Sequence, residues 1–285
     1  MPTAAPFPPG PDNPIGVLDS GVGGLSVLRA IRAELPHESV LYVADQTHLP
    51  YGPRPPEEIR TFVTGITRFL LAQGAKIIVV ACNAASAASL HYLRKAFPGV
   101  PFIGMEPAVK PASQATKSGV IGVLTTEATA NGPLYARVVE RYAKGVQVET
   151  LVCPELVQAI ENKQTDLSAL RPIFEKTLAP ALAKGADQIV LGCTHFPFAA
   201  AAIRAYAGPD VQVIDPSPAI ARQTRRVLAQ HDLLNNGQTV QAPSRYYTTG
   251  DPARFLELIE VLLSESPPTT HLTWIDGRLE VPITQ

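Results

Sequence analysis

The sequence has few cysteines, few charged residues and no long apolar run. Cys82, Cys153 and Cys193 are the only cysteines among 285 residues and none forms a CxxC pair, which argues against a disulfide framework or a thiolate zinc site. Charged residues make up 17% of the chain, below the usual share of about a quarter. The net charge of -1 gives no global attraction for nucleic acid or an anionic membrane. No stretch approaches the roughly 18 to 20 apolar residues of a membrane span.

The first fourteen residues, MPTAAPFPPGPDNP, have neither the basic nor the apolar segment of a secretory signal. Their high proline content predicts a disordered tail over residues 1–13. Together with the free thiols, this composition predicts a cytoplasmic protein.

Short apolar runs alternate with longer alanine-rich stretches of helical character, a pattern typical of an α/β protein. The runs are continuous, as in strands of a mostly parallel sheet that is covered on both faces. The predicted strands are 15–18, 40–44, 76–81, 100–104, 120–124, 146–152, 188–192 and 211–215.

The chain contains an internal repeat. LAQGAKIIVVACN (71–83) aligns without gaps with LAKGADQIVLGCT (182–194) at an offset of 182 − 71 = 111, with seven of thirteen positions identical. IGVLDS (15–20) matches IGVLTT (121–126) at a similar offset of 106. We therefore expect two homologous α/β lobes with mostly parallel sheets, related by pseudo-two-fold symmetry, with an active site in the cleft between them. The first lobe would comprise 14–108 plus 216–285, and the second 109–215.

Two of the cysteines occupy equivalent positions in this repeat. Cys82 and Cys193 each end an apolar strand, and ligands of open α/β sheets bind beyond the carboxyl ends of the strands. A helix beginning after either cysteine would favour its thiolate, and His195 follows Cys193 by two residues. Asp19 and Ser20 end the first strand, which we expect to lie beside the Cys82 strand.

A pair of thiols on opposite sides of a small substrate suits inversion of a stereocentre. One thiolate removes a proton from carbon while the opposite thiol delivers a proton to the other face. Two groups are needed because a single base would have to change faces, and a thiol pKa near about 8.5 can be lowered towards neutral pH.

Three other classes of protein share parts of this pattern. A nucleotide-dependent oxidoreductase would explain GVGG after a strand, but the third glycine of GxGxxG falls at Ser26. A two-lobed amino-acid-binding protein would leave the twin thiols unexplained. A thiol hydrolase with a Cys193–His195 dyad would leave Cys82 without a role.

Four segments carry a family resemblance: DSGVGGLSV (19–27), ADQTHLPYG (44–52), ACNAAS (81–86) and GCTHFPF (192–198). Together they resemble glutamate racemase, a member of the aspartate/glutamate racemase superfamily. The resemblance implies interconversion of L- and D-glutamate without a cofactor or a metal, supplying D-glutamate for peptidoglycan. It also implies a homodimer, and some relatives interact with DNA gyrase. Racemisation of aspartate is the nearest alternative activity.

The resemblance also implies roles for individual residues. Cys82, assisted by Asp19, would deprotonate D-glutamate, and Cys193, assisted by His195 with Glu161 nearby, would deprotonate L-glutamate. The implied substrate-binding residues are Asp19, Ser20, Pro50, Tyr51, Gly52, Cys82, Asn83, Ala84, Thr126, Cys193, Thr194 and His195. Ala84 departs from the family, which usually has threonine there, and 271–285 lies beyond the matched region.

Several other residues have simpler interpretations. Cys153 is expected to be a buried structural thiol, because free cysteine usually behaves as a small apolar residue. Asp45 fits a turn at a strand end as well as a neighbour of the substrate. The glycines of SGVGG are expected to permit a tight turn, and the remaining histidines to lie in packing or surface positions. The glycines are Gly21, Gly23 and Gly24, and the histidines are His37, His48, His91, His231 and His271.

Overall fold

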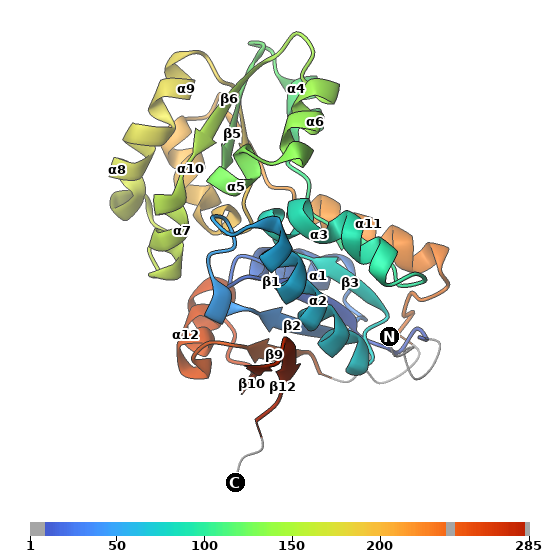
Figure 1. Cartoon of the computed structure of the whole chain (residues 1–285). Helices are drawn as coiled ribbons and strands as arrows, with labels where there is room; N and C mark the ends of the chain where they lie inside the picture. The colour runs from blue at the N-terminus through green and yellow to red at the C-terminus, as the bar shows by residue number, and fades with distance from the viewer. Residues whose placement is uncertain (1–8, 238–242, 283–285) are drawn as a thin grey trace. The chain divides into compact units, whose positions relative to one another are not determined.

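The computed structural model describes residues 9–237 and 243–282, which form two compact units (Figure 1). Unit 1 is built from the described residues up to Gly104 together with those from Ser217 onward. Unit 2 is Met105–Pro216. No helix in the described part of the chain is long and apolar enough to cross a membrane.

Unit 1 contains a six-stranded parallel sheet in the order β10-β9-β2-β1-β3-β4. Its strands are β1 (Ile15–Asp19), β2 (Val40–Ala44), β3 (Ile77–Val80), β4 (Phe102–Gly104), β9 (Arg245–Thr248) and β10 (Thr269–His271). Every residue of β1, β2 and β3 is buried, because helices cover both faces of the sheet.

The helices of unit 1 form two layers. One layer contains α1 (Leu25–Glu34), α11 (Ser217–Gln230) and α12 (Pro252–Leu263), with α1 packed against the other two. The other contains α2 (Pro56–Ala72) packed against α3 (Asn83–Ala96), and the short 3-10 helix η1 (Gln46–His48) follows β2. Pro56 in the first turn of α2, followed by Glu57 and Glu58, is favourable at a helix N-terminus.

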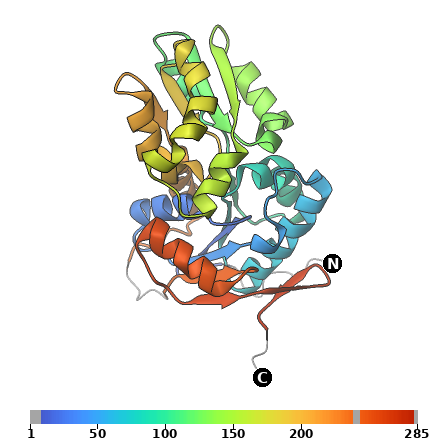
Figure 2. The same cartoon turned by 90° about the vertical axis from the view of Figure 1, so that its left-hand side faces the viewer.

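A C-terminal β-hairpin completes unit 1. Its strands β11 (Thr273–Ile275) and β12 (Arg278–Glu280) pair with each other in antiparallel register and belong to neither large sheet. β12 packs against α2, and the hairpin is drawn in red in Figure 2.

Unit 2 contains a four-stranded parallel sheet in the order β6-β5-β7-β8. Its strands are β5 (Val120–Thr125), β6 (Gln147–Val152), β7 (Gln188–Leu191) and β8 (Gln212–Ile214). Its helices are α4 (Val109–Ala115), α5 (Glu127–Ala130), α6 (Pro133–Tyr142), α7 (Pro154–Glu161), α8 (Leu167–Thr177), α9 (Ala179–Ala183), η2 (Phe196–Ala199) and α10 (Ala200–Ala207). α4 packs with α6, whereas α8 packs with α7, α9 and α10.

The two sheets repeat the same arrangement. The order β2-β1-β3-β4 in unit 1 corresponds strand by strand to β6-β5-β7-β8 in unit 2. The packing at the centre also repeats: a Cβ on Gly16 would lie 2.9 Å from Cδ1 of Ile78, and a Cβ on Gly122 would lie 2.7 Å from Cδ1 of Ile189. These residues correspond at the offsets found in the sequence, since 16 + 106 = 122 and 78 + 111 = 189. The α/β class and all eight predicted strands are thus confirmed.

Two features differ from the expectation. Strands β9 to β12 were not predicted; they are short and their sequences have no continuous apolar run. Of the tail expected to be disordered, residues 1–8 lie outside the described residues, but Pro11 and Asn13 are hydrogen-bonded to the rest of unit 1. Asn13 Nδ2 donates to the carbonyl oxygen of Gly74, and Lys76 Nζ donates to that of Pro11. The backbone polar groups of this short segment thus find partners, which proline content alone does not indicate.

Candidate active site

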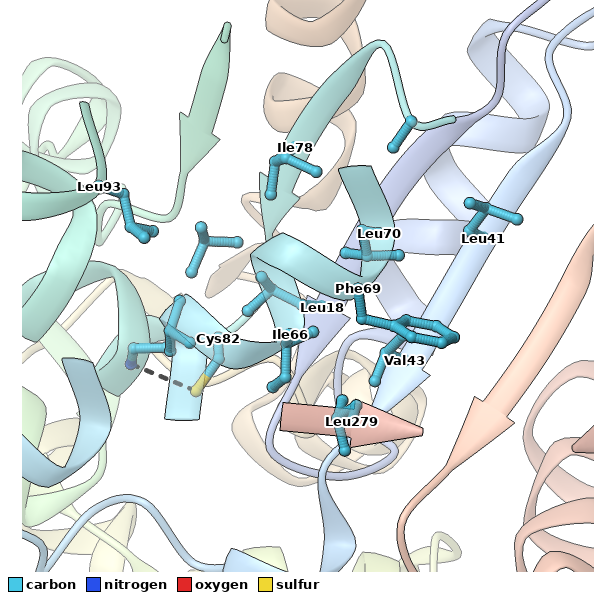
Figure 3. Close-up of a cluster of buried hydrophobic side chains, with 14 of the residues drawn as sticks. Leu18, Leu41, Val43, Ile66, Phe69, Leu70, Ile78, Cys82, Leu93 and Leu279 are labelled. Atoms are coloured by element: carbon cyan, nitrogen blue, oxygen red, sulfur yellow. Dashed lines mark hydrogen bonds between the residues drawn. The ribbon is translucent and has the colours of Figure 1, made fainter. Parts of the chain in front are cut away.

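The first thiol lies where β3 passes into α3. Cys82 is the extended N-cap residue of α3, and its Sγ accepts a hydrogen bond from the backbone N–H of Ala85 at 3.5 Å (Figure 3). Ser20 Oγ lies 3.7 Å from the same sulfur. An N-cap position favours negative charge, so this geometry favours the thiolate of Cys82.

Asp19 ends β1, the strand beside β3, as expected from the sequence. Its carboxylate is 1% exposed, and Oδ2 accepts hydrogen bonds from the backbone N–H groups of Gly21 at 3.1 Å and Gly24 at 2.9 Å. A Cβ on Gly24 would lie 2.8 Å from the Cβ of Asp19, so this glycine is required by close packing. The SGVGG segment therefore forms the tight turn that was predicted and also anchors the Asp19 carboxylate.

The PYG segment places one aromatic side chain beside the first thiol. Tyr51 is buried in the same apolar cluster as Cys82. The pKa of Tyr51 is raised well above 10, first by burial, then by the charge of Asp45 and a hydrogen bond to it, and then by the charges of Cys82 and Asp19. Its hydroxyl therefore stays protonated and acts as a donor. Pro50 on one side is exposed, and Gly52 on the other is half-buried.

Asn83, the first residue of α3, has an unusual environment. Asn83 is only 5% exposed, yet neither its amide oxygen nor its amide nitrogen has a hydrogen-bond partner among the described residues. Buried amides are normally paired, so an Asn with both amide atoms unpaired is a good candidate for binding a polar ligand. Ala84, which follows it, is half-buried against the core cluster and offers no hydrogen-bonding side chain there.

The second thiol belongs to a chain of three polar side chains. Cys193 follows β7, and its Sγ lies 3.7 Å from Nδ1 of His195. Nε2 of the same ring lies 2.8 Å from Oε1 of Glu161, the last residue of α7. Burial by itself lowers the pKa of His195, but hydrogen bonds to Cys193 and Glu161 and their negative charges raise it well above its ordinary value. The imidazole ring of His195 therefore lies between the side chain of Glu161 on one side and the sulfur of Cys193 on the other.

No α-helix begins directly after Cys193. The backbone N–H of Phe196 bonds to the carbonyl oxygen of Cys193 in a 3-10 turn, and α10 begins only at Ala200. An α-helix capped at Cys193 would need an N–H at residue 197 to reach the same carbonyl group, and Pro197 has none. A helix N-terminus that favours a thiolate is therefore present at Cys82 but not at Cys193, whose neighbour is the imidazole of His195.

Two further predicted residues of unit 2 are threonines. Thr126 is the extended N-cap residue of α5, and its Oγ1 donates to Oγ1 of Thr129 at 3.4 Å. Thr194 follows the thiol and is 2% exposed. The ends of β5 and β7 are joined by Thr125, whose Oγ1 donates to the carbonyl oxygen of Gly192 at 3.4 Å.

The repeat brings out a difference between the two thiol environments. At the offset of 111, Cys82 corresponds to Cys193 and Asn83 to Thr194, but Ala84 corresponds to His195. At the offset of 106, Asp19 corresponds to Thr125. Each unit thus keeps the thiol, but unit 1 has an ionisable residue at the end of its β1 strand, and unit 2 has one two positions after the thiol.

Some chemistry-bearing residues lie outside these sets. Cys153 is fully buried at the N-terminus of α7, where burial raises the pKa of its thiol, consistent with the structural role expected for it. No cluster of three or more His, Cys, Asp or Glu side chains within residues 9–237 and 243–282 could hold a metal ion. An open pocket of about 600 Å³ on unit 1, lined in part by Arg29 and Arg32, contains none of the predicted site residues.

Asp45 is the residue whose importance the sequence did not reveal. It follows β2, is fully buried, and accepts hydrogen bonds from side chains as far away in the sequence as Thr249 and Trp274. A polar residue after a strand within ADQTHLPYG was a weak signal for this, and the distant donors gave no signal at all.

Comparison with known proteins gives a consistent result. Residues 15–224 match the family model Asp/Glu/Hydantoin racemase. A glutamate racemase from Herpetosiphon aurantiacus is 49% identical over 251 residues, covering 88% of this chain and 98% of that protein. The crystal structure of a glutamate racemase isoform from Bacillus anthracis has a TM-score of 0.81 at 33% identity, covering 91% of this chain and 97% of that chain. Escherichia coli glutamate racemase in complex with L-glutamate and the activator UDP-MurNAc-Ala has a TM-score of 0.77 at 32% identity, covering 87% and 94%.

Proposed function

Because this chain belongs to the Asp/Glu/hydantoin racemase family, we propose that it interconverts L- and D-glutamate by proton transfer at Cα. The substrate is a small amino acid with two carboxylates. The named relatives favour glutamate over aspartate, the alternative that the sequence left open.

The observation that carries the proposal is the occurrence of equivalent thiols in two units of the same topology. Cys82 and Cys193 each follow a strand of the same rank in its sheet, and each sulfur lies within hydrogen-bonding distance of a polar group. Removing a weakly acidic proton from carbon needs a thiolate, and the N-cap position and the imidazolium each favour one.

The proton balance of the reaction assigns a role to each thiol. In one direction the thiolate of Cys82 takes the Cα proton of D-glutamate, and the thiol of Cys193 delivers its proton to the opposite face. The product leaves the protonation states of the two thiols exchanged, and the reverse reaction starts from that form. Asp19 and His195, with Glu161, serve as the charged groups that adjust the basicity of the nearer thiol.

The remaining predicted residues are proposed to bind the substrate. The unpaired amide of Asn83 and the hydroxyls of Ser20, Thr126 and Thr194 suit the carboxylates and ammonium of glutamate. Pro50, Tyr51 and Gly52 would form one wall beside Cys82.

The Cys193–His195–Glu161 chain also matches the arrangement of a thiol hydrolase, in which a histidine activates the nucleophile and a carboxylate orients the histidine. A hydrolase needs only this one thiol. Cys82 is placed separately, at the N-cap of α3, where its thiolate is favoured. A second activated thiol would have no function in a hydrolase, so its presence favours the racemase.

The test is isotope exchange. The purified protein, incubated in heavy water with L-glutamate or D-glutamate and no added cofactor, should incorporate deuterium at Cα and produce the other enantiomer. Aspartate in parallel incubations should exchange far more slowly. No exchange with either amino acid would overturn the proposal, and faster exchange with aspartate would reassign the substrate.

Family membership also supports a homodimer in the cytoplasm whose D-glutamate enters peptidoglycan. Light scattering coupled to size exclusion tests the oligomer, and rescue of a D-glutamate auxotroph tests the supply of D-glutamate. An interaction with DNA gyrase has only the resemblance to some relatives in its favour.

A further inference from the structure

The buried carboxylate of Asp45 joins three segments of unit 1: its own loop, the end of β9 and the C-terminal hairpin. Its Oδ2 accepts hydrogen bonds from Tyr51 Oη at 2.7 Å and His48 Nδ1 at 2.9 Å. Its Oδ1 accepts from Thr249 Oγ1 at 2.9 Å and Trp274 Nε1 at 2.8 Å. Four donors match the four acceptor positions of an ionised carboxylate. Because Asp45 is fully buried, it depends on these donors for all of its solvation.

One of these donors connects Asp45 to the first thiol. Tyr51 lies in the same buried cluster as Cys82. After burial and Asp45, the charges of Cys82 and Asp19 also raise the pKa of its phenol. The position of the Tyr51 hydroxyl is set by Asp45, at the other end of the 2.7 Å hydrogen bond. A displacement of the Asp45 carboxylate would therefore be transmitted through Tyr51 to the buried cluster that contains the thiol.

Another donor comes from the far end of the chain. Trp274 lies on β11 of the C-terminal hairpin, and its indole fits against α2 at Gly65, where there is no room for a side chain. A Cβ on Gly65 would lie 2.5 Å from Cζ3 of Trp274 and 2.8 Å from the carbonyl oxygen of Gly277. Leu279 of the same hairpin belongs to the buried cluster that contains Cys82 (Figure 3).

Aromatic packing fixes the indole from a second direction. The ring of His48 stacks on that of Phe62 at a centroid distance of 3.7 Å, and Trp274 meets His48 edge-on at 5.3 Å. Both His48 and Trp274 donate to Asp45, so the ring packing and the hydrogen bonds support the same geometry. The indole N–H has little freedom to point anywhere else.

We propose that the C-terminal hairpin is a positioning element for the first thiol site: the Trp274 indole N–H fixes the Asp45 carboxylate, and Asp45 in turn holds Tyr51 in the buried cluster that contains Cys82. Trp274 and Asp45 are positioning residues, since they act through Tyr51. The inference rests on the proposed racemase function, because Cys82 is taken as a catalytic thiol.

The decisive variant is Trp274→Phe, which keeps an aromatic ring against Gly65 and removes the N–H. We expect kcat/KM for glutamate to fall about tenfold, because small misplacements of groups around a reacting centre are costly. Tyr51→Phe breaks the same chain of hydrogen bonds one step later. The variant that carries both substitutions should therefore have the same kcat/KM as Tyr51→Phe alone. A purely structural role for Trp274 predicts instead that the two reductions in kcat/KM multiply.

Two further variants separate the hydrogen bond from general damage. Gly65→Ala leaves the N–H in place but pushes the indole away from α2, and should give the same defect, again without a further loss in the Tyr51→Phe background. Ile275→Ala changes the neighbouring residue of β11, whose side chain is 47% exposed, and should leave activity unchanged. If Trp274→Phe lowers the thermal midpoint of unfolding but not kcat/KM, the inference is wrong.

A readout without turnover distinguishes failure of this inference from failure of the proposed function. The rates at which iodoacetamide alkylates Cys82 and Cys193 are measured by mass spectrometry of their peptides. Trp274→Phe should change the rate for Cys82 by severalfold and leave that for Cys193 unchanged. If the wild-type protein is inactive on glutamate but Trp274→Phe changes the alkylation rates in this way, the racemase function is rejected and the inference stands. Equal changes at both thiols, or none at Cys82, would overturn the inference even in an active racemase.

Discussion

Oε1 of Glu161 lies 2.8 Å from Nε2 of His195, on the side of the ring away from Nδ1, which faces the sulfur of Cys193 at 3.7 Å. The carboxylate therefore acts on the thiol through the imidazole. The resemblance had placed Glu161 only near the second thiol. The structure explains why an acidic residue belongs there: a buried imidazolium needs a negative partner.

Glu161→Gln should shift the pH dependence of catalysis. The protonated form of His195 stabilises the thiolate of Cys193, so activity should fall as the pH rises through the pKa of His195. Part of the upward shift of that pKa comes from Glu161, and the glutamine retains a hydrogen-bonding group without the charge. The alkaline limb of the kcat/KM profile should move down by about 1 to 3 pH units, the effect of one close opposite charge.

Glu155→Gln is the matched control for this shift. Glu155 belongs to the same helix α7 but pairs with exposed Lys176 at 2.8 Å. Its replacement should leave the profile unchanged. An unmoved alkaline limb in Glu161→Gln, or an equal shift in both variants, would show that Glu161 does not tune His195.

His195→Gln should make stability less dependent on pH. The pKa of His195 is raised in the folded protein above its unfolded value of about 6.5. A raised pKa contributes stability that is complete below the unfolded pKa and is lost as the pH rises through the folded pKa. The wild type should therefore exceed the variant in thermal midpoint by more at about pH 6 than at about pH 9. Calorimetry at the two pH values checks this, and a gap that grows with pH would contradict it.

The three cysteines should separate cleanly when each is replaced by serine. Cys82→Ser and Cys193→Ser should each reduce racemisation by a factor of at least about 10² to 10⁴, because a serine hydroxyl is far too weak an acid to replace a catalytic thiol. Cys153→Ser should remain active, since its sulfur interacts with Thr177 in the interior of unit 2 and serine can keep that hydrogen bond. Coupled-enzyme detection of D-glutamate measures all three. Equal losses would indicate that the thiols are structural.

The central strands of both units could be predicted because they are continuous buried runs, and the repeat located the thiols. β1 and β3 are buried along their whole length, and burial on both faces leaves a pattern that a single sequence carries. The motif after each strand also placed Ser20 beside Cys82 and His195 beside Cys193. These relationships are local to a strand and its immediate neighbour.

Other relationships depend on long-range packing and left no local pattern. Trp274 reaches Asp45 across 229 positions of the chain, on a hairpin whose three-residue strands are mostly exposed. Pro197 lacks the N–H that an α-helix capped at Cys193 would need, and this feature is visible in the sequence. Asp45 looked like a turn residue because none of its distant donors could be inferred.

Gly24→Ala tests whether the SGVGG turn holds Asp19 by close packing. The added Cβ would lie 2.8 Å from the Cβ of Asp19, 2.9 Å from the hydroxyl of Tyr42 and 3.1 Å from the Cβ of Ala81. Two of these neighbours are attached directly to the backbone and cannot rotate away. The variant should lose about 1 to 3 kcal/mol of stability in urea denaturation, the usual cost of overpacking, and Asp19 should lose its bond from the Gly24 N–H. Adding Tyr42→Phe should restore only part of the stability, because the contacts with Asp19 and Ala81 remain. Complete rescue by Tyr42→Phe would show that the hydroxyl alone requires glycine at this position.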